Sequence, residues 1–464
     1  MKRKPNLLII MSDQHRYDCT GASGDYPVRT PNIDRIAQEG TWFTNAYTPL
    51  PVCGPARGAF VCGRRPESFG AYWNDGITLP VASLTAGDYS WARALQAAGY
   101  RNGYIGKWGA SASAAPTAFG YDHYLDADKV YAEFRAAKYP SFCFTGGFLG
   151  EPDPVPLDDS PTHWLAEQAS RMIEQLAGEG DPWHIRVNFS EPHLPCRPAA
   201  PFAKMYDPAA VPRWRSFGET FTAKPYIQRQ QLVNWGIEQF EWEDWAPIVA
   251  RYYGIISQMD DAIGKILLAL SRLGLEHDTI VIYTSDHGDL CGGHRMLDKH
   301  YVMYDDLVKV PLAIRWPGVI APQQRCDAFV HHVLDLPPTI LEWIGEKAPE
   351  HFHGRSLLPL LQGELPADWR TAAVSTYNGQ QFGLFVQRMI RTNSWKYVWN
   401  PTDRDELYDL AGDPDELVNR VSDPECTEVL AALRKALYEE LKQAGDGIVR
   451  GSWLEGQLLA NRKL

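Results

Sequence analysis

The chain has 464 residues, of which 45% are apolar and 22% charged, and it carries a formal net charge of -12. This length accommodates two domains, and the composition is that of an ordinary globular protein. The acidic balance disfavours nucleic acid or an anionic membrane surface as the main partner, so an anionic substrate would need a locally positive site.

The cysteines and the N-terminal segment give signals about the cellular location of the protein. Eight cysteines are scattered along the chain without a CxxC pair, which disfavours both a zinc ribbon and a disulfide scaffold. The apolar run after Pro5 is too short for a signal peptide and ends in Ser12-Asp13. No segment approaches the roughly 18 apolar residues of a membrane span. We therefore predict a cytoplasmic protein with reduced thiols and no membrane partner.

Buried strands alternate with helices over the first 345 residues. The apolar run 7–11 is typical of a central parallel strand that is covered on both faces. The elements expected after it are helices over 30–40, 53–62, 83–98, 162–177 and 244–273, and strands over 100–105, 183–189, 279–284 and 310–315. The stretch 197–240 lacks a clear period and is predicted to be a surface insertion. This order predicts an α/β fold with a large mixed, mostly parallel sheet sandwiched by helices.

The pattern changes after Pro359. Three short strand-like runs over 372–377, 383–390 and 396–398 are followed by the stretch 406–410 and a helix near 426–443. We therefore predict a large domain over 1–359 and a smaller C-terminal α+β subdomain with a small antiparallel sheet over 360–464.

A short stretch, Cys53-Gly54-Pro55-Ala56-Arg57, resembles a functional site more than core packing. Pro55 suits the first turn of a helix, which would put the Cys53 side chain at a helix N-terminus. Backbone N–H groups and Arg57 would favour an anion there. A buried cysteine in a proline-rich loop is the alternative for this stretch alone.

Polar residues follow two of the predicted strands. They are Asp13 and Gln14 after the first strand, and Asp286 and His287 after the strand over 279–284. Open α/β sheets place their ligands at the carboxyl ends of strands, although aspartate is also common in strand-ending turns. The set suits a divalent cation: Ca²⁺ if the oxygens dominate, Mn²⁺ or Zn²⁺ if the histidine is decisive.

A set of basic residues could serve an anionic ester. Its members are Arg57, Lys107, His193 and Lys299. Each is separately explicable as a surface or capped residue. Together they offer what a sulfate or phosphate ester needs, namely positive charge on the non-bridging oxygens and a proton for the leaving oxygen.

Several motifs together resemble one family. Cys53-Gly54-Pro55-Ala56-Arg57 matches a C-x-P-x-R signature, and Gly106-Lys107-Trp108 ends a second one. Ser285-Asp286-His287-Gly288, with Lys299 downstream, matches a late metal and lysine block, and Glu406–Leu410 resembles the C-terminal subdomain. The sequence thus resembles the type I, formylglycine-dependent sulfatases of the alkaline phosphatase-like superfamily from residue 6 to about 420.

This resemblance implies a role for each matched residue. It implies that a maturation enzyme oxidises Cys53 to formylglycine, whose hydrated aldehyde would be the nucleophile and also touch the metal. The implied metal ligands are Asp13, Gln14, Asp286 and His287, with Ca²⁺ as the ion. Arg57 would stabilise the diol, Lys107 and Lys299 would bind the sulfate oxygens, and His193 would be the general acid.

The chain departs from the family pattern at three positions. Gln14 stands where many relatives have a second aspartate, a pattern also seen in phosphonate monoester hydrolases and choline sulfatases. Gly109 stands where the second signature usually has histidine, and His15 or His123 is a candidate substitute. Ala56 replaces the common serine or threonine.

Three functions remain open at this stage. The first is hydrolysis of a sulfate ester on a carbohydrate, bound by Asn74, Trp73 and Arg197 with Trp214 and Arg215 at the rim. The second is a phosphonate monoester or phosphodiester hydrolase on the same scaffold. The third is a non-catalytic relative that binds a sulfated ligand, which only Gly109 favours. The oligomeric state is open, with a homo-oligomer among the alternatives.

Overall fold

The first strand of the chain lies in the middle of the main sheet. The computed structural model describes residues 4–76 and 79–463. β1 (Asn6–Asp13) is buried along its whole length between two parallel neighbours. Leu7 and Ile9 pack on one face of the sheet, and Leu8 and Ile10 pack on the other. The apolar run therefore forms the central strand that the sequence predicts.

Eight strands form the main sheet. In spatial order they are β5 (His123–Leu125), β4 (Arg101–Gly106), β6 (Trp183–Pro192), β1, β7 (Thr279–Ser285), β8 (Leu312–Arg315), β2 (Thr41–Phe43) and β9 (Gln324–Cys326). Only β8 pairs antiparallel with its neighbours. The mixed, mostly parallel sheet is thus confirmed. A separate two-stranded ladder joins β3 (Ala46–Tyr47) to β10 (Val330–His331).

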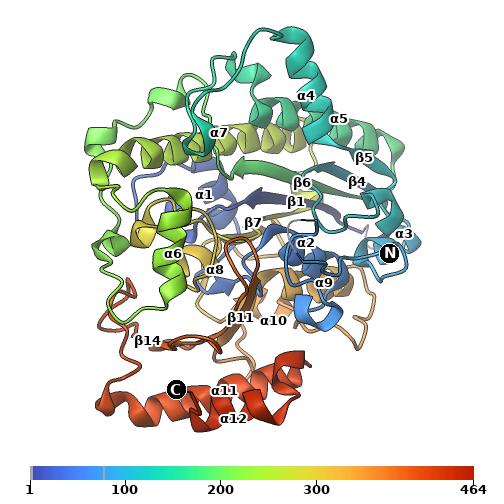
Figure 1. Ribbon diagram of the computed structural model, residues 1–464. Helices are drawn as coiled ribbons and strands as arrows, with labels where there is room; N and C mark the ends of the chain where they lie inside the picture. Colours follow the sequence, from blue (N-terminus) through green and yellow to red (C-terminus); the bar gives the residue numbers. More distant parts are fainter. Residues whose placement is uncertain (1–3, 77–78, 464) are drawn as a thin grey trace.

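Helices cover both faces of this sheet (Figure 1). One face carries α1 (Pro31–Gln38), α5 (Pro161–Glu179) and the long α7 (Trp242–Arg272). The other face carries α2 (Cys53–Cys62), α3 (Trp91–Ala97), α9 (His332–Trp343) and α10 (Leu358–Leu361). The remaining helices up to residue 310 are α4 (Ala127–Lys138), α6 (Tyr226–Trp235) and α8 (Asp305–Val308).

The C-terminal part forms its own antiparallel sheet. Its strands, in order, are β11 (Ala373–Gly379), β12 (Phe385–Arg391), β13 (Trp395–Trp399) and β14 (Glu406–Asp409). α11 (Thr427–Gln443) and α12 (Ser452–Ala460) pack against this sheet at the far end of the molecule (Figure 1). The predicted C-terminal α+β subdomain is therefore present, while a boundary at residues 359/360 stays a prediction.

Two segments differ from the sequence prediction. The helix expected over 83–98 begins only at Trp91, because Asp88 accepts hydrogen bonds from Thr85 in a turn and Ser90 caps the helix through the N–H of Ala92. The stretch 197–240 is not merely a surface insertion. It contains α6, and Phe217 within it is fully buried in an apolar cluster.

The N-terminus of α1 is capped by a residue from a distant helix. Thr30 precedes α1 but makes no side-chain capping bond. Instead the buried carboxylate of Asp260, in α7, accepts the backbone N–H groups of Asn32 and Ile33 at 3.1 and 2.8 Å. This contact supplies the acceptors that the first turn of a helix needs and ties α1 to α7.

Replacing this cap should destabilise the fold. We expect Asp260→Ala to lower the free energy of unfolding by about 3 kcal/mol, because buried N–H groups of α1 would lose their acceptor. Urea denaturation followed by circular dichroism would measure this loss. Asp261→Ala is the matched control, since the Asp261 side chain is 50% exposed and pairs with His163 alone among the residues that the structure describes. Equal losses in the two variants would contradict the capping role.

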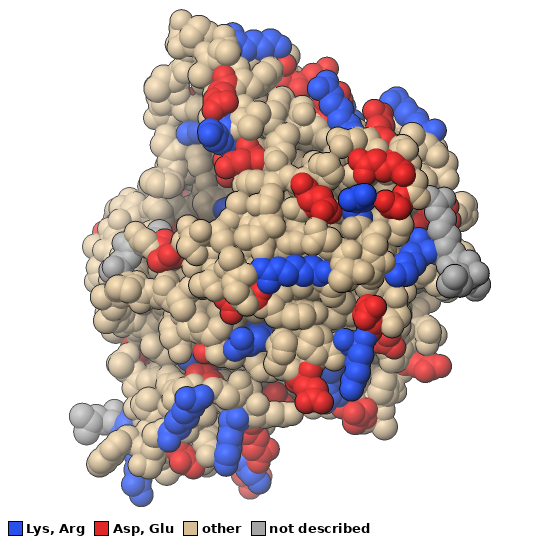
Figure 2. All heavy atoms as spheres, turned by 90° about the vertical axis from the view of Figure 1, so that its right-hand side faces the viewer, with Lys and Arg blue, Asp and Glu red and all other residues tan. Residues whose placement is uncertain are grey.

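The surface gives two further observations. Among the described residues, no helix is long and apolar enough to cross a membrane. On the face shown in Figure 2, basic and acidic side chains of the described residues are interspersed rather than gathered into one broad patch. That nucleic acid is not the main partner stays a prediction from the net charge.

Candidate active site

Cys53 is the first residue of α2 and lies at the floor of a cavity. Its side chain is only 5% exposed, and Gly63 ends the helix in the left-handed conformation. The N–H of Gly54 donates to Asn74 Oδ1 at 2.9 Å. A Cβ at position 54 would lie 2.8 Å from that oxygen and 3.1 Å from the carbonyl oxygen of Gly109, so a larger residue would require Asn74 to move. The small size of Gly54 thus preserves this hydrogen bond.

Four buried side chains meet at one point. They are Asp13, Cys53, Asp286 and His287, and their ligand atoms all lie within 4.8 Å of one another. Cys53 Sγ lies 3.4 Å from Asp13 Oδ1 and 3.2 Å from His287 Nε2. The neighbouring strands β1 and β7 bring the two aspartates together, since Ser12 pairs with Ser285. His287 Nδ1 lies 2.8 Å from the carbonyl oxygen of Gly288, so donation there leaves the Nε2 lone pair facing the cluster.

Two cations neutralise the carboxylates of this cluster. Arg57, which is fully buried, donates to Asp286 Oδ2 at 2.9 Å and to Asp13 Oδ2 at 3.2 Å. Lys107 also forms an ion pair with Asp13. Burial opposes ionisation of Asp13, but Lys107 and Arg57 outweigh it and hold the pKa of this carboxyl well below its usual range. The Asp13 carboxyl is therefore ionised at neutral pH, as a ligand of a metal cation must be.

Gln14 connects this cluster to Lys299. Its backbone N–H donates to Asp286 Oδ1 at 3.2 Å, and its side-chain Oε1 accepts a hydrogen bond from Lys299 Nζ at 2.6 Å. Its Nε2 donates to Asp289 and, at 3.1 Å, to Asp298. The amide is therefore held at both ends beside the carboxylate cluster. Its role as a metal ligand stays a prediction.

His193 and Lys299 form a pair that could handle a proton. Lys299 Nζ lies 3.1 Å from His193 Nε2, and His193 Nδ1 lies 2.6 Å from the carbonyl oxygen of Leu194. Burial and the positive charge of Lys299 lower the pKa of His193 to about 4. The imidazole is therefore neutral above about pH 4, with Nδ1 donating to Leu194 and Nε2 accepting from Lys299. At neutral pH the available proton is on Lys299.

The predicted catalytic residues open into one cavity. It has a volume of about 310 Å³, and Cys53, Lys107, His193 and Lys299 line it. Trp73 and Asn74 also line it, as expected of substrate-binding residues. Trp73 is 3% exposed and packs on His300 at a ring-centroid distance of 5.3 Å. The nucleophile position and two lysine cations thus face one space, which suits the cleavage of an anionic ester.

The comparisons with known proteins now decide the family. The family model for sulfatases matches residues 5–346, and the model for the C-terminal region of N-sulphoglucosamine sulphohydrolase matches residues 292–443. The chain belongs to the sulfatase family.

Individual relatives agree with this assignment. An arylsulfatase of Clostridium perfringens is 27% identical over 480 residues, which cover 97% of each chain. An N-acetylglucosamine-6-O-sulfatase of Bacteroides thetaiotaomicron is 25% identical and covers 96% of this chain and 87% of its own. The crystal structure of a phosphonate monoester hydrolase of Agrobacterium radiobacter superposes with a TM-score of 0.81 at 26% identity, covering 95% of this chain and 96% of its own. This sulfatase is a sulfuric ester hydrolase.

Some residues predicted at the rim of the sulfatase site lie elsewhere. Trp214 is only 1% exposed, and its Nε1–H donates to the carbonyl oxygen of Cys291, so its prediction as a rim residue is wrong. Arg215 forms ion pairs with Asp25 and Asp415 and lines a different cavity. Both belong to the stretch 197–240, whose aromatic residues pack inward rather than cover the surface.

Neither proposed substitute for the missing histidine reaches the cavity. His15 is fully buried, and its two ring nitrogens contact Tyr283 Oη at 2.6 Å and the carbonyl oxygen of Cys19 at 2.9 Å. His123 lies in β5, at the edge of the main sheet. Gly109 itself lines the cavity with φ at +65°, and a Cβ there would lie 3.3 Å from Arg57 Cδ. Within the described residues, the cavity keeps open space at this position.

The sequence analysis missed an acidic partner of the site. Asp298 accepts from Lys299 Nζ and from Gln14 Nε2, both at 3.1 Å, and pairs with His300 Nε2 at 2.9 Å. It raises the pKa of Lys299 above its usual value, although burial alone would lower it. The only local signal is the run Asp298-Lys299-His300, which reads equally well as a solvated loop.

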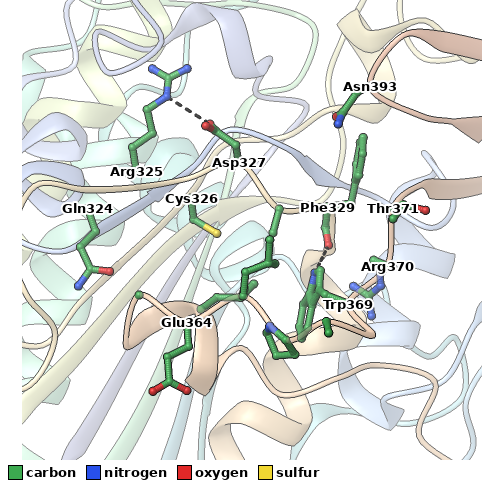
Figure 3. A pocket seen from close by; sticks show the side chains of 16 residues that line it. Gln324, Arg325, Cys326, Asp327, Phe329, Glu364, Trp369, Arg370, Thr371 and Asn393 are labelled. Carbon is green, nitrogen blue, oxygen red and sulfur yellow. Dashed lines mark hydrogen bonds and ion pairs between the residues drawn. The ribbon is translucent and has the colours of Figure 1, made fainter.

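A second cavity of about 520 Å³ lies beside β9 and is lined by none of the predicted site residues (Figure 3). Its two arginines are already paired. Arg325 contacts Asp327 at 3.3 Å, and Arg370 contacts the buried Asp335 with Nη2 at 2.8 Å. Trp369 Nε1 donates to the carbonyl oxygen of Phe329 at 2.9 Å. Among the described residues, this cavity therefore offers no unpaired cation to an anionic ester.

Proposed function

We propose that this sulfatase hydrolyses a sulfate ester on a carbohydrate and releases inorganic sulfate. In this proposal the nucleophile is a formylglycine made from Cys53 by a maturation enzyme. The supporting observation is the meeting of Asp13, Cys53, Asp286 and His287 at one buried point beside the basic residues. The predicted cytoplasmic location is part of the proposal, and fractionation of the host would test it.

The donor set fits a divalent metal. Asp13 and Asp286 offer hard anionic oxygens, and His287 offers a nitrogen lone pair in the same cluster. Gln14 would complete the set through Oε1, which now accepts from Lys299. We take Ca²⁺ as the ion, with Mn²⁺ or Zn²⁺ as alternatives. When bound, the metal would supply positive charge next to the nucleophile and a sulfate oxygen.

The unmodified thiol is a poor nucleophile in this environment. Burial raises the pKa of Cys53 to about 12, so the thiol stays protonated at neutral pH. A formylglycine at this position would supply a hydrated aldehyde. One of its hydroxyls would attack sulfur and displace the sugar oxygen, and the other would lose its proton and expel sulfate, which regenerates the aldehyde. Arg57 is placed to hold the carboxylates around this nucleophile through its bonds to Asp13 and Asp286.

The remaining residues bind the ester and handle the proton. Lys107 and Lys299 line the cavity and are placed to contact the sulfate oxygens. The leaving oxygen needs a proton, and Lys299, which carries one at neutral pH and lines the cavity, is placed to donate it directly. The neutral His193 holds Lys299 in place through Nε2 at 3.1 Å. Trp73 gives an apolar wall to the sugar, while Asn74 orients the nucleophile through Gly54.

Comparison of matched esters tests the proposal. We expect purified mature enzyme to release sulfate from a sulfated sugar such as glucosamine 6-sulfate, with kcat/KM at least about tenfold above that for a phosphonate monoester of similar size. Ion chromatography of released sulfate would measure the turnover. Turnover of the phosphonate without turnover of any sulfate ester would overturn the carbohydrate sulfatase assignment.

A phosphonate monoester or phosphodiester hydrolase is the second candidate. Gln14 favours it, because the neutral amide leaves the metal cluster with one carboxylate fewer than the common family pattern. The structural likeness to the Agrobacterium radiobacter phosphonate monoester hydrolase also supports it. The same comparison of sulfate and phosphonate esters separates the two functions.

A further inference from the structure

A further cavity, distinct from the one beside β9, adjoins the catalytic cavity. It has a volume of about 370 Å³ and lies between α4, the end of β6 and the loop that carries residues 193–197. Lys107 and His193 line both cavities. A ligand held by its ester at Cys53 can therefore extend past these two residues into the adjoining space.

Two arginines line this adjoining cavity, but only one of them is neutralised. Arg135 forms a two-pronged ion pair with Asp153, at 2.6 and 2.9 Å. Arg197 forms no ion pair and no hydrogen bond with any other residue in 4–76 or 79–463. The nearby Glu151 accepts instead from the N–H groups of Thr145 and Gly146, at 2.5 and 2.6 Å. A positive charge without a partner thus lines the wall.

The Arg197 side chain is held in place by an aromatic ring. Its guanidinium carbon lies 3.7 Å from the centre of the Phe144 ring, which fixes the plane of the group. Its Nε is buried without a hydrogen-bond acceptor. Because a buried donor without an acceptor is costly, an acceptor from a ligand would be favourable there. A carboxylate or sulfate group matches the paired donors of a guanidinium.

We infer that the natural substrate carries a second anionic group, which Arg197 binds in the adjoining cavity. This inference rests on the proposed function, because it places the first anion, the sulfate ester, at Cys53. The second anion is a carboxylate or another sulfate on the same or the neighbouring sugar. Glu191 lies in the same wall, but burial raises its pKa to about 7, which weakens its repulsion of an anion near neutral pH.

Substrates that differ in one anionic group test this inference. We expect Arg197→Gln to lower kcat/KM about tenfold or more on doubly anionic substrates and by less than about threefold on glucosamine 6-sulfate. The doubly anionic substrates are glucosamine 2,6-disulfate and a sulfated disaccharide that ends in a uronic acid. The substrate with the larger loss identifies the second anion as sulfate or carboxylate.

Control variants separate a loss of substrate recognition in Arg197→Gln from a loss of folding. Arg171→Gln removes an exposed arginine of α5, 66% accessible, and should leave both substrate classes unaffected. Arg197→Lys keeps the charge but not the paired donors, so it should fall between wild type and Arg197→Gln. Thermal unfolding of each variant reports any loss of fold. Equal losses on singly and doubly anionic substrates would overturn the inference.

A binding measurement keeps the inference testable without turnover. Calorimetry would compare Cys53→Ala protein with the Cys53→Ala, Arg197→Gln double variant, using the same singly and doubly anionic sugars. We expect Arg197→Gln to weaken binding of only the doubly anionic sugars. Equal affinities in the two proteins would overturn the inference. Absence of wild-type turnover on every sulfate ester would instead count against the proposed function alone.

Discussion

Cys53→Ala should abolish sulfate ester hydrolysis, with kcat lowered by about 10⁴-fold or more, because the proposed nucleophile can no longer be formed. The alanine methyl group fits the space of the buried thiol at the start of α2 and removes no charge, so the fold should survive. Steady-state release of sulfate measures the loss of activity. Peptide mass spectrometry of wild-type protein should find an aldehyde in place of the thiol at position 53.

Cys62→Ala is the matched control for this variant. Cys62 is also buried, 2% exposed, and lies at the other end of the same helix, away from the cavity. It should lose some stability and keep its activity. Wild-type activity in Cys53→Ala would refute the formylglycine mechanism, whereas activity in wild-type protein that retains an intact thiol would refute the modification.

The central sheet and its ligand edge were predictable because their signals are local. The apolar runs that form β1 and β7 end in Asp13-Gln14 and Asp286-His287, and parallel neighbours bring such ends to one edge. The same logic placed Cys53 at the start of α2, where Pro55 suits the first turn. The assembly of the four-residue cluster follows from these local features together with the family resemblance.

Features that depend on distant partners were not predictable in this way. Thr30 has the identity of a helix cap, yet Asp260 caps α1 from 230 residues away. Tryptophan is a residue type that suits sugar binding, yet Trp214 is buried and its Nε1–H donates to the carbonyl oxygen of Cys291. The direction of β8 depends on its pairing with β7 and β2, which its own apolar pattern does not encode.

The network behind the metal cluster was also hidden in the sequence. Gln14 is interpretable as a metal ligand from its place after Asp13, but its amide also joins Lys299 to Asp298. Gln14 lies more than 280 positions from both Asp298 and Lys299 in the sequence, so only the folded structure shows that they share hydrogen bonds. Gln14 thus orients Lys299, the lysine that we propose as the proton donor, in addition to any contact with a metal.

Asp13→Asn should have the second large effect, because Asp13 is the carboxylate on which the cations of the site converge. We expect metal affinity to fall by about 100-fold or more and kcat by about 10³-fold. The variant keeps the shape of the side chain but removes one of the anionic oxygens of the cluster. Arg57 and Lys107 would then lose a common counter-charge, and their uncompensated charge would further repel a cation.

Asp18→Asn is the control that separates a loss of metal binding from the general effect of removing a negative charge. Asp18 is an aspartate five residues away with a close arginine partner, Arg16, but it lies outside the cluster. Titration calorimetry with Ca²⁺, Mn²⁺ and Zn²⁺ should show unchanged affinity in Asp18→Asn and a loss in Asp13→Asn. Unchanged metal affinity in Asp13→Asn would remove this residue from the ligand set. If activity were still lost, the role of Asp13 would be to hold Arg57 and Lys107 in place for the ester.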